Sequence, residues 1–206
     1  MENLFNIDSF DFIWSDQHFN HDNIVKYSMR PGYDPRGFGH DFEKHNALML
    51  ENAHRFIRPN DKVLNLGDIA MGKREDAKLL GELPGDNYLI LGNHDKWGQK
   101  FYEDLGITVI LPFEFQQEGA FDVSFTHYPR RQLRGNEINI HGHIHNNPCD
   151  FLTRRHNNMS VEVIGYQPLP FKKVVENALY NAKSPSDLNF RELEWNKAKR
   201  NEPLFK

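Results

Sequence analysis

Residues 88–95 read Tyr-Leu-Ile-Leu-Gly-Asn-His-Asp, a short apolar run that ends in a glycine and continues into polar side chains. Similar apolar runs lead into polar, metal-capable residues at 10–14, 63–66, 123–126 and 138–140. Their lengths of about four to six residues and their β-branched and aromatic side chains are typical of buried strands. Segments with helical character lie between them, over 41–57, 74–83 and 99–105. This alternation of strands and helices favours an α/β fold.

The rest of the chain continues the pattern with a higher helical content. A strand is predicted over 160–164, an amphipathic helix over 171–182 and a charged helix over 187–200. We find no repeat, low-complexity tract or linker in the sequence. Residues 1–206 are therefore interpreted as a single domain, with 166–206 as a C-terminal helical extension.

The composition excludes several classes of protein. Lys and Arg total 25 against 29 Asp and Glu, so the chain lacks the positive field of a general nucleic-acid binder. The single cysteine, Cys149, rules out an intrachain disulfide and a cysteine-based zinc cluster, which suits a reducing compartment. The first residues do not resemble a signal peptide, and no apolar run approaches the ~18 residues of a membrane span. We therefore expect a cytoplasmic protein with no membrane partner.

Polar residues that follow the predicted strands form the candidate site, because ligands of open α/β sheets gather beyond the carboxyl ends of the strands. Asp16 and His18 are two positions apart, which places them on one face of an extended backbone. His143 and His145 repeat this spacing with two imidazoles, a moderate metal signal. Taken singly, Asp68 and His127 are weak signals. A strand-end aspartate is often only a helix cap, and a lone histidine at a strand end is more often structural.

The combination is more specific than any one motif. The candidate ligands are three oxygen donors and four nitrogen donors: Asp16, Asp68 and Asn93, with His18, His127, His143 and His145. Such a set exceeds what one tetrahedral metal needs. It fits two divalent cations about 3.5–4 Å apart, which together can activate a water and clamp the oxygens of an in-line displacement.

The ordered blocks from Asp16 to His145 resemble the calcineurin-like metallophosphoesterase superfamily. The stretch that begins Ser15-Asp16-Gln17-His18-Phe19-Asn20-His21 is similar to a small bacterial and phage branch of it. The resemblance implies a four-layer αββα sandwich of two mixed sheets flanked by helices. Asp95 after His94, and Ile69 after Asp68, depart from the superfamily's protein Ser/Thr phosphatases and count against that activity.

The resemblance also implies a role for each block. One cation would be held by Asp16, His18 and His145, and the other by Asn93, His127 and His143. The Asp68 carboxylate would bridge the two cations. His94 would not be a ligand but would assist the leaving oxygen, with its ring paired to Asp68 or Asp95. Mn²⁺ is the expected cation, although Fe, Zn²⁺ and Ni²⁺ also suit the mixed donor set.

These features predict a metal-dependent phosphoesterase in which a metal-bridging hydroxide attacks phosphorus. A phosphodiesterase acting on a small nucleotide-like or cyclic diester leads, because a chain of 206 residues has little room for a cap that holds duplex DNA. RNA or DNA ends would also fit an exposed site. A phosphomonoesterase is the alternative, and a non-catalytic metal-binding scaffold of the same fold is a third hypothesis.

Several other polar residues have weaker claims. His21 and Arg30 are candidate substrate contacts, weighed against a helix N-terminus for His21 and a solvated loop charge for Arg30. His141 is expected beside the ligands. Tyr128 is interpreted as packing in a turn, with stacking on a base as the alternative. The remaining histidines are expected on helix faces or loops: His40, His45, His54 and His156.

Overall fold

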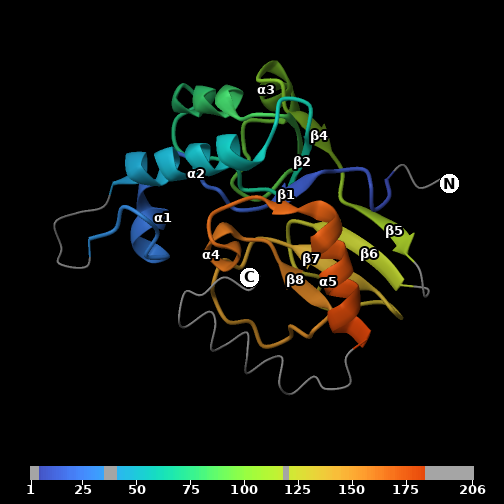
Figure 1. Ribbon diagram of the computed structural model, residues 1–206. Helices are drawn as coiled ribbons and strands as arrows, with labels where there is room; N and C mark the ends of the chain where they lie inside the picture. The colour runs from blue at the N-terminus through green and yellow to red at the C-terminus, as the bar shows by residue number, and fades with distance from the viewer. Residues whose placement is uncertain (1–4, 35–40, 118–120, 184–206) are drawn as a thin grey trace.

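The computed structural model describes residues 5–34, 41–117 and 121–183. Two β-sheets lie at its centre (Figure 1). The first has the order β4-β3-β2-β1-β9, formed by Thr108–Ile110, Asp86–Ile90, Lys62–Asn65, Phe12–Trp14 and Leu169–Pro170. Strands β1 to β4 run parallel, and β9 is antiparallel to β1.

The second sheet has the order β5-β6-β7-β8, formed by Phe113–Gln117, Phe121–Thr126, Ile138–His141 and His156–Asn158. Strands β6, β7 and β8 are parallel, and β5 pairs antiparallel with β6. Both sheets are therefore mixed, and helices flank them. The predicted α/β class with two mixed sheets is confirmed.

The helices are α1 (Asp22–Tyr27), α2 (Phe42–Phe56), α3 (Gln99–Asp104), α4 (Val161–Ile164) and α5 (Phe171–Lys183). A 3₁₀ helix, η1, spans Asp76–Glu82. In Figure 1, α2 and α3 lie on the side of the molecule opposite α5. Helix α5 contacts β1 and β9 of the first sheet and β7 of the second.

Aromatic side chains pack together where the two sheets meet α5. The ring of Phe125 in β6 stacks on Phe113 of β5 at 4.8 Å and on Phe171 of α5 at 5.2 Å between centroids. Phe10, just before β1, contacts Phe171 edge-on at 5.3 Å. Such pairs add about 0.5–1.5 kcal/mol each to the free energy gained by burial. This cluster fixes the sheets, and hence the loops at their ends, relative to one another.

The prediction of a strand over 160–164 is wrong. Val161–Ile164 is a short buried helix, α4, which begins after Ser160 and ends at Gly165 with φ of 79°. The alternation Val-Glu-Val-Ile imitates a strand, but all four side chains are buried. The neighbouring strand is β8, whose polar sequence His-Asn-Asn gave no apolar signal.

The other predicted elements agree with the structure to within a few residues, although 74–83 forms a 3₁₀ helix rather than an α-helix. Strands β4, β5, β8 and β9 were not predicted, and helix α1 was anticipated only through the alternative of a helix N-terminus at His21. The expected helix over 187–200, and most of the expected extension over 166–206, lie outside the described residues. Within the described parts of the chain, no helix is both long and apolar enough to cross a bilayer.

Candidate metal centre

The expected ligands all follow the carboxyl ends of parallel strands. Asp16 and His18 come after β1, Asp68 after β2, and Asn93 after β3 of the first sheet. In the second sheet His127 follows β6, and His143 and His145 follow β7. The structure brings these side chains together into two adjoining groups of donors.

The first group consists of Asp16, His18 and His145, and the second of Asp68, His127 and His143. Within each group the donor atoms lie within 4.8 Å of one another. Asp68 Oδ2 is 3.4 Å from His127 Nε2 and 3.6 Å from His18 Nε2, so its carboxylate stands between the groups. Asn93 Oδ1 is 3.1 Å from His127 Nε2 and joins the second group.

The backbone reaches this geometry by a route that the sequence spacing did not predict. Asp16, His18 and Asp68 have φ of 60°, 52° and 53°, and His143 and His145 have φ of 71° and 52°. The sequence spacing assumed an extended backbone, which places residues i and i+2 on one face. These five residues instead have φ angles in the left-handed region. Non-glycine residues rarely adopt this region, and such strain concentrates at functional sites.

Glycines allow the loops to approach one another closely. A Cβ added at Gly142 would lie 2.3 Å from Asp16 Oδ2, and one added at Gly92 would lie 2.2 Å from Asp68 Oδ1. Neither contact is sterically allowed. The two carboxylates therefore occupy space that only a glycine leaves open.

The donor set fits divalent cations. Among the described residues, His18 Nε2 and His143 Nδ1 are buried without a hydrogen-bond partner. A buried nitrogen of this kind is costly unless something satisfies it, and a cation would do so. His127 Nδ1 donates to the Leu66 carbonyl oxygen at 2.8 Å, which leaves Nε2 as the donor atom on the side of Asp68.

The protonation states also suit metal binding. Burial, with Arg30 nearby, lowers the pKa of His18 well below its usual value, and burial lowers that of His143. Burial opposes ionisation of Asp68, but hydrogen bonds from His127 and the His94 amide hold its pKa below the usual value. Burial would lower the pKa of His127, yet the Asp68 carboxylate raises it. The lowered pKa values favour a neutral imidazole at His18 and His143 and an ionised carboxylate at Asp68, which are the forms that bind cations.

His94 lies beside the two groups and is partly exposed. Its Nε2 is 4.0 Å from Asp68 Oδ2, and its side chain is 29% exposed. The His94 amide donates to Asp68 Oδ1 at 2.7 Å. Of the two partners expected for the ring, the structure places Asp68 beside it.

Asp95 has a structural role that the sequence did not reveal. Its carboxylate accepts hydrogen bonds from the amides of Asp68, Ile69 and Gly92 at 2.7 to 3.1 Å. Burial, together with the nearby Asp68 charge, raises the pKa of Asp95 to about 6. Asp95 therefore ties the loop after β2 to the loop after β3.

His21 lies near the site, whereas Arg30 does not reach its open side. His21 precedes α1, and its Nδ1 is 3.3 Å from His18 Nδ1. Arg30 is only 1% exposed, and its guanidinium is committed to buried partners. The interpretation of Arg30 as a substrate contact is corrected accordingly.

The expectation of helix-face or loop positions is confirmed for His45, which lies on α2, and is wrong for His156, which lies in a strand. His45 is buried on α2 and donates from Nε2 to the Gln17 carbonyl oxygen at 2.8 Å. His156 is buried in β8 and donates from Nε2 to the Arg130 carbonyl oxygen at 2.8 Å. His141, expected beside the ligands, is buried in β7.

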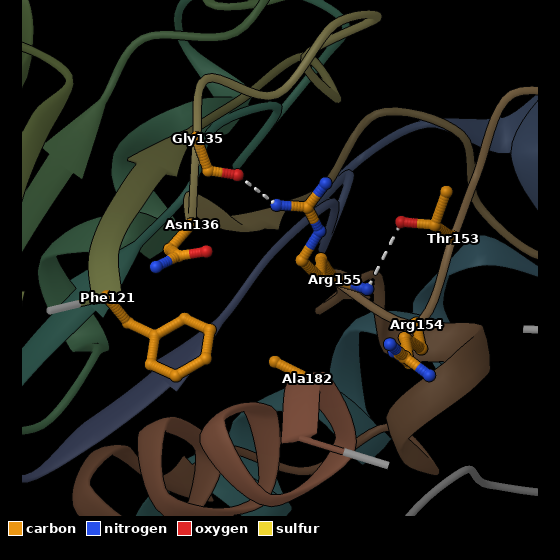
Figure 2. Close-up of a pocket in the computed structure, with 7 residues that line it drawn as sticks. All are labelled: Phe121, Gly135, Asn136, Thr153, Arg154, Arg155 and Ala182. Atoms are coloured by element: carbon orange, nitrogen blue, oxygen red, sulfur yellow. Dashed lines mark hydrogen bonds between the residues drawn. The ribbon is translucent and has the colours of Figure 1, made fainter. Parts of the chain in front are cut away.

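A separate pocket of about 320 Å³ has none of the candidate ligands among its lining residues (Figure 2). Phe121 begins β6, and Thr153, Arg154 and Arg155 precede β8, so the pocket lies at the amino ends of these strands. The donor groups lie at the opposite, carboxyl ends. Arg155 donates to the Gly135 carbonyl oxygen across the pocket wall.

A clear sequence relative is MJ1445, an uncharacterised protein of Methanocaldococcus jannaschii. It is 34% identical to this chain over 173 residues, which cover 80% of the chain and 89% of MJ1445. The chain belongs to the MJ1445 family. No model of an established protein family matches this chain.

Solved structures extend the comparison to the fold. AQ665, a protein of unknown function from Aquifex aeolicus, is 22% identical and superposes with a TM-score of 0.57. The match covers 80% of this chain and 97% of AQ665, and it shows that the two proteins share a fold. The nuclease MPE of Pseudomonas putida is 21% identical and reaches a TM-score of 0.37 over 65% of this chain and 60% of its own. That likeness is too low to bear on function.

Proposed function

We propose that this chain is a phosphoesterase that uses two divalent cations and has the metallo-dependent phosphatase fold. The supporting observation is the Asp68 carboxylate, which stands 3.6 Å from His18 Nε2 and 3.4 Å from His127 Nε2. A carboxylate between two compact donor groups could contact both members of a pair of neighbouring cations. The first group would hold one cation and the second group, with Asn93, the other.

When bound, the two cations would supply an activated water and neutralise charge on the phosphoryl oxygens. The protein would hold the two cations in place through Asp16 and Asp68, whose carboxylates are buried and fixed by backbone amides. The loops that present these carboxylates are already folded into their left-handed conformations. Little reorganisation would then be needed when substrate binds.

His94 is the proposed proton donor. Its Nε2 lies 4.0 Å from Asp68 Oδ2, and its side chain is 29% exposed, so it can reach a substrate at the site. As the bond between phosphorus and the ester oxygen breaks, His94 Nε2 would give its proton to the departing oxygen. Proton donation from a positioned side chain typically contributes ~10²–10⁴-fold in rate.

A small phosphodiester is the proposed substrate, for example a cyclic nucleotide or an RNA or DNA end. Two features support an open site: the partly exposed His94 and Tyr128, which is 52% exposed beside His143. The Tyr128 ring centroid lies 4.3 Å from that of His143, so a planar base could stack near the reacting phosphate. Mn²⁺ is the proposed cation.

The test is hydrolysis of bis-p-nitrophenyl phosphate and p-nitrophenyl phosphate by Mn²⁺-loaded protein, with His94→Ala and Asp68→Asn as variants. We expect metal-dependent hydrolysis that favours the diester, and a large loss of rate in both variants. A preference for the monoester would overturn the proposed diester activity. Equal, metal-independent background from all three proteins would overturn the proposed enzyme.

A further inference from the structure

A buried ion pair lies behind the first donor group. Arg30 and Glu162 are 1% and 4% exposed, and Arg30 binds Glu162 Oε1 through Nη2 at 2.6 Å and through Nε at 2.8 Å. Burying two charges costs several kcal/mol each unless their geometry and further hydrogen bonds compensate. The further hydrogen bonds made by this pair therefore indicate what it is for.

Arg30 holds the loop that carries Asp16 and His18. Its Nη2 donates to the Asp16 carbonyl oxygen at 2.8 Å, and its Nη1 donates to the Gln17 carbonyl oxygen at 2.8 Å. These carbonyls belong to the segment in which Asp16 and His18 have left-handed φ angles. Because that conformation is strained, charge-assisted hydrogen bonds to its carbonyls help to hold it.

Glu162 holds the third member of the same group. Its Oε1 accepts a hydrogen bond from His145 Nδ1 at 3.0 Å. A proton fixed on Nδ1 leaves the lone pair on Nε2 as the ring's donor to a cation. Two residues earlier, Ser160 Oγ donates to Asp16 Oδ2 at 2.9 Å, so the start of α4 supports two ligands at once.

The second group has different supports. Asp68 is held by the His94 amide, and His127 by the Leu66 carbonyl oxygen. Neither Arg30 nor Glu162 has a hydrogen bond to Asp68, His127 or His143 among those the described residues make. The ion pair thus acts on one half of the site.

We infer that Arg30 and Glu162 are positioning residues for the half-site of Asp16, His18 and His145, and that they raise the affinity of this half-site for its cation more than that of the other half-site. The inference rests on the proposed function, because it assumes a two-cation centre. Loss of an outer hydrogen-bond partner of a metal-binding histidine typically weakens metal binding ~10–100-fold. Removing the support of one half-site should therefore convert a two-cation centre into a one-cation centre at limiting metal.

The test is Mn²⁺ binding to full-length Glu162→Gln, followed by calorimetry and by electron paramagnetic resonance. Wild-type protein should bind two Mn²⁺ and show the spectrum of a spin-coupled pair. In Glu162→Gln we expect one site to weaken ~10–100-fold, so that limiting Mn²⁺ gives the uncoupled six-line spectrum. Excess Mn²⁺ should restore the coupled spectrum.

Glu137→Gln is the matched control. Glu137 is also buried and binds an arginine, with Arg130 Nε 3.0 Å from its Oε1, but it has no hydrogen bond to either donor group among the described contacts. Both sites should keep their affinity in this variant. If Glu162→Gln does not fold because the buried Arg30 charge is left unpaired, the double variant Arg30→Met/Glu162→Gln removes both charges. It should show the same selective loss.

The outcomes separate the two proposals. The positioning role would be overturned if a folded Glu162→Gln or double variant bound both Mn²⁺ ions with wild-type affinity and gave the coupled spectrum. The proposed function would then remain intact. Equal weakening of both sites would also overturn it. Wild-type protein that binds no Mn²⁺ would instead overturn the proposed two-cation centre itself.

Discussion

Replacing Gly92 by alanine tests whether the position of the Asp68 carboxylate matters to activity. The added Cβ would lie 2.2 Å from Asp68 Oδ1, whereas ordinary van der Waals contact begins at 3.4 Å, so the carboxylate must retreat by about 1 Å. The same Cβ would lie 2.6 Å from the Asp68 amide nitrogen and 2.8 Å from His127 Cε1. No single side-chain rotation relieves all three contacts.

The expected losses follow from that displacement. Overpacking of this kind lowers the free energy of unfolding by about 1–3 kcal/mol, which most domains survive. A misplacement of about 1 Å at a reacting centre can cost ~10²-fold in rate. The hydrogen bond from the His94 amide to Asp68 Oδ1, now 2.7 Å long, would also be disrupted.

The assay is kcat/KM for bis-p-nitrophenyl phosphate with saturating Mn²⁺, measured beside the melting temperature. Gly81→Ala serves as the control, because a Cβ at Gly81, in η1, meets nothing within 4 Å among the described atoms. We expect Gly92→Ala to be folded and to lose at least ~10²-fold in rate, while Gly81→Ala matches wild type. A folded Gly92→Ala variant with wild-type kcat/KM would show that activity does not depend on the position of the Asp68 carboxylate.

Three further variants test the roles of His94, Tyr128 and His45. His94→Ala should lower kcat by ~10²–10⁴-fold while calorimetric Mn²⁺ affinity is unchanged, and loss of both together would argue against a proton donor. Tyr128→Ala should raise KM for a cyclic nucleotide by about tenfold but not for its base-free analogue, as base stacking is worth ~1–3 kcal/mol; equal effects would exclude stacking. Burial lowers the pKa of His45 to about 4 from 6.5, so the neutral ring stabilises the fold above pH 6.5 and this stability is lost as pH falls toward 4. Urea titrations in EDTA should show that the free energy of unfolding falls by about 3 kcal/mol less between pH 6.5 and 4 in His45→Gln than in wild type. The same pH dependence in both proteins would contradict the burial argument.

The sequence carried enough information for the strands and for the donors that follow them. Apolar runs such as 63–66 and 138–140 became β2 and β7 because buried strands need continuous apolar side chains. Parallel strands bring their carboxyl ends to the same edge, so residues as distant as Asp16 and His145 meet. This part of the prediction depends on topology more than on detailed geometry.

What surrounds the donors could not be predicted in the same way. Glu162 sits in a Val-Glu-Val-Ile sequence that resembles a half-buried strand, and nothing local marks its carboxylate as buried beside Arg30. Asp95 follows His94 directly, yet its function is to accept backbone amides from two loops. Both roles arise from contacts between segments far apart in the chain, which periodicity does not record.

The most direct measurement is an anomalous difference map from crystals of the protein grown with Mn²⁺. We predict two peaks about 3.5–4 Å apart, one coordinated by Asp16 and His145, the other by His127 and His143, with Asp68 contacting both. A map with no peak among these side chains, or with a single peak that leaves one group unengaged, would contradict the two-cation centre.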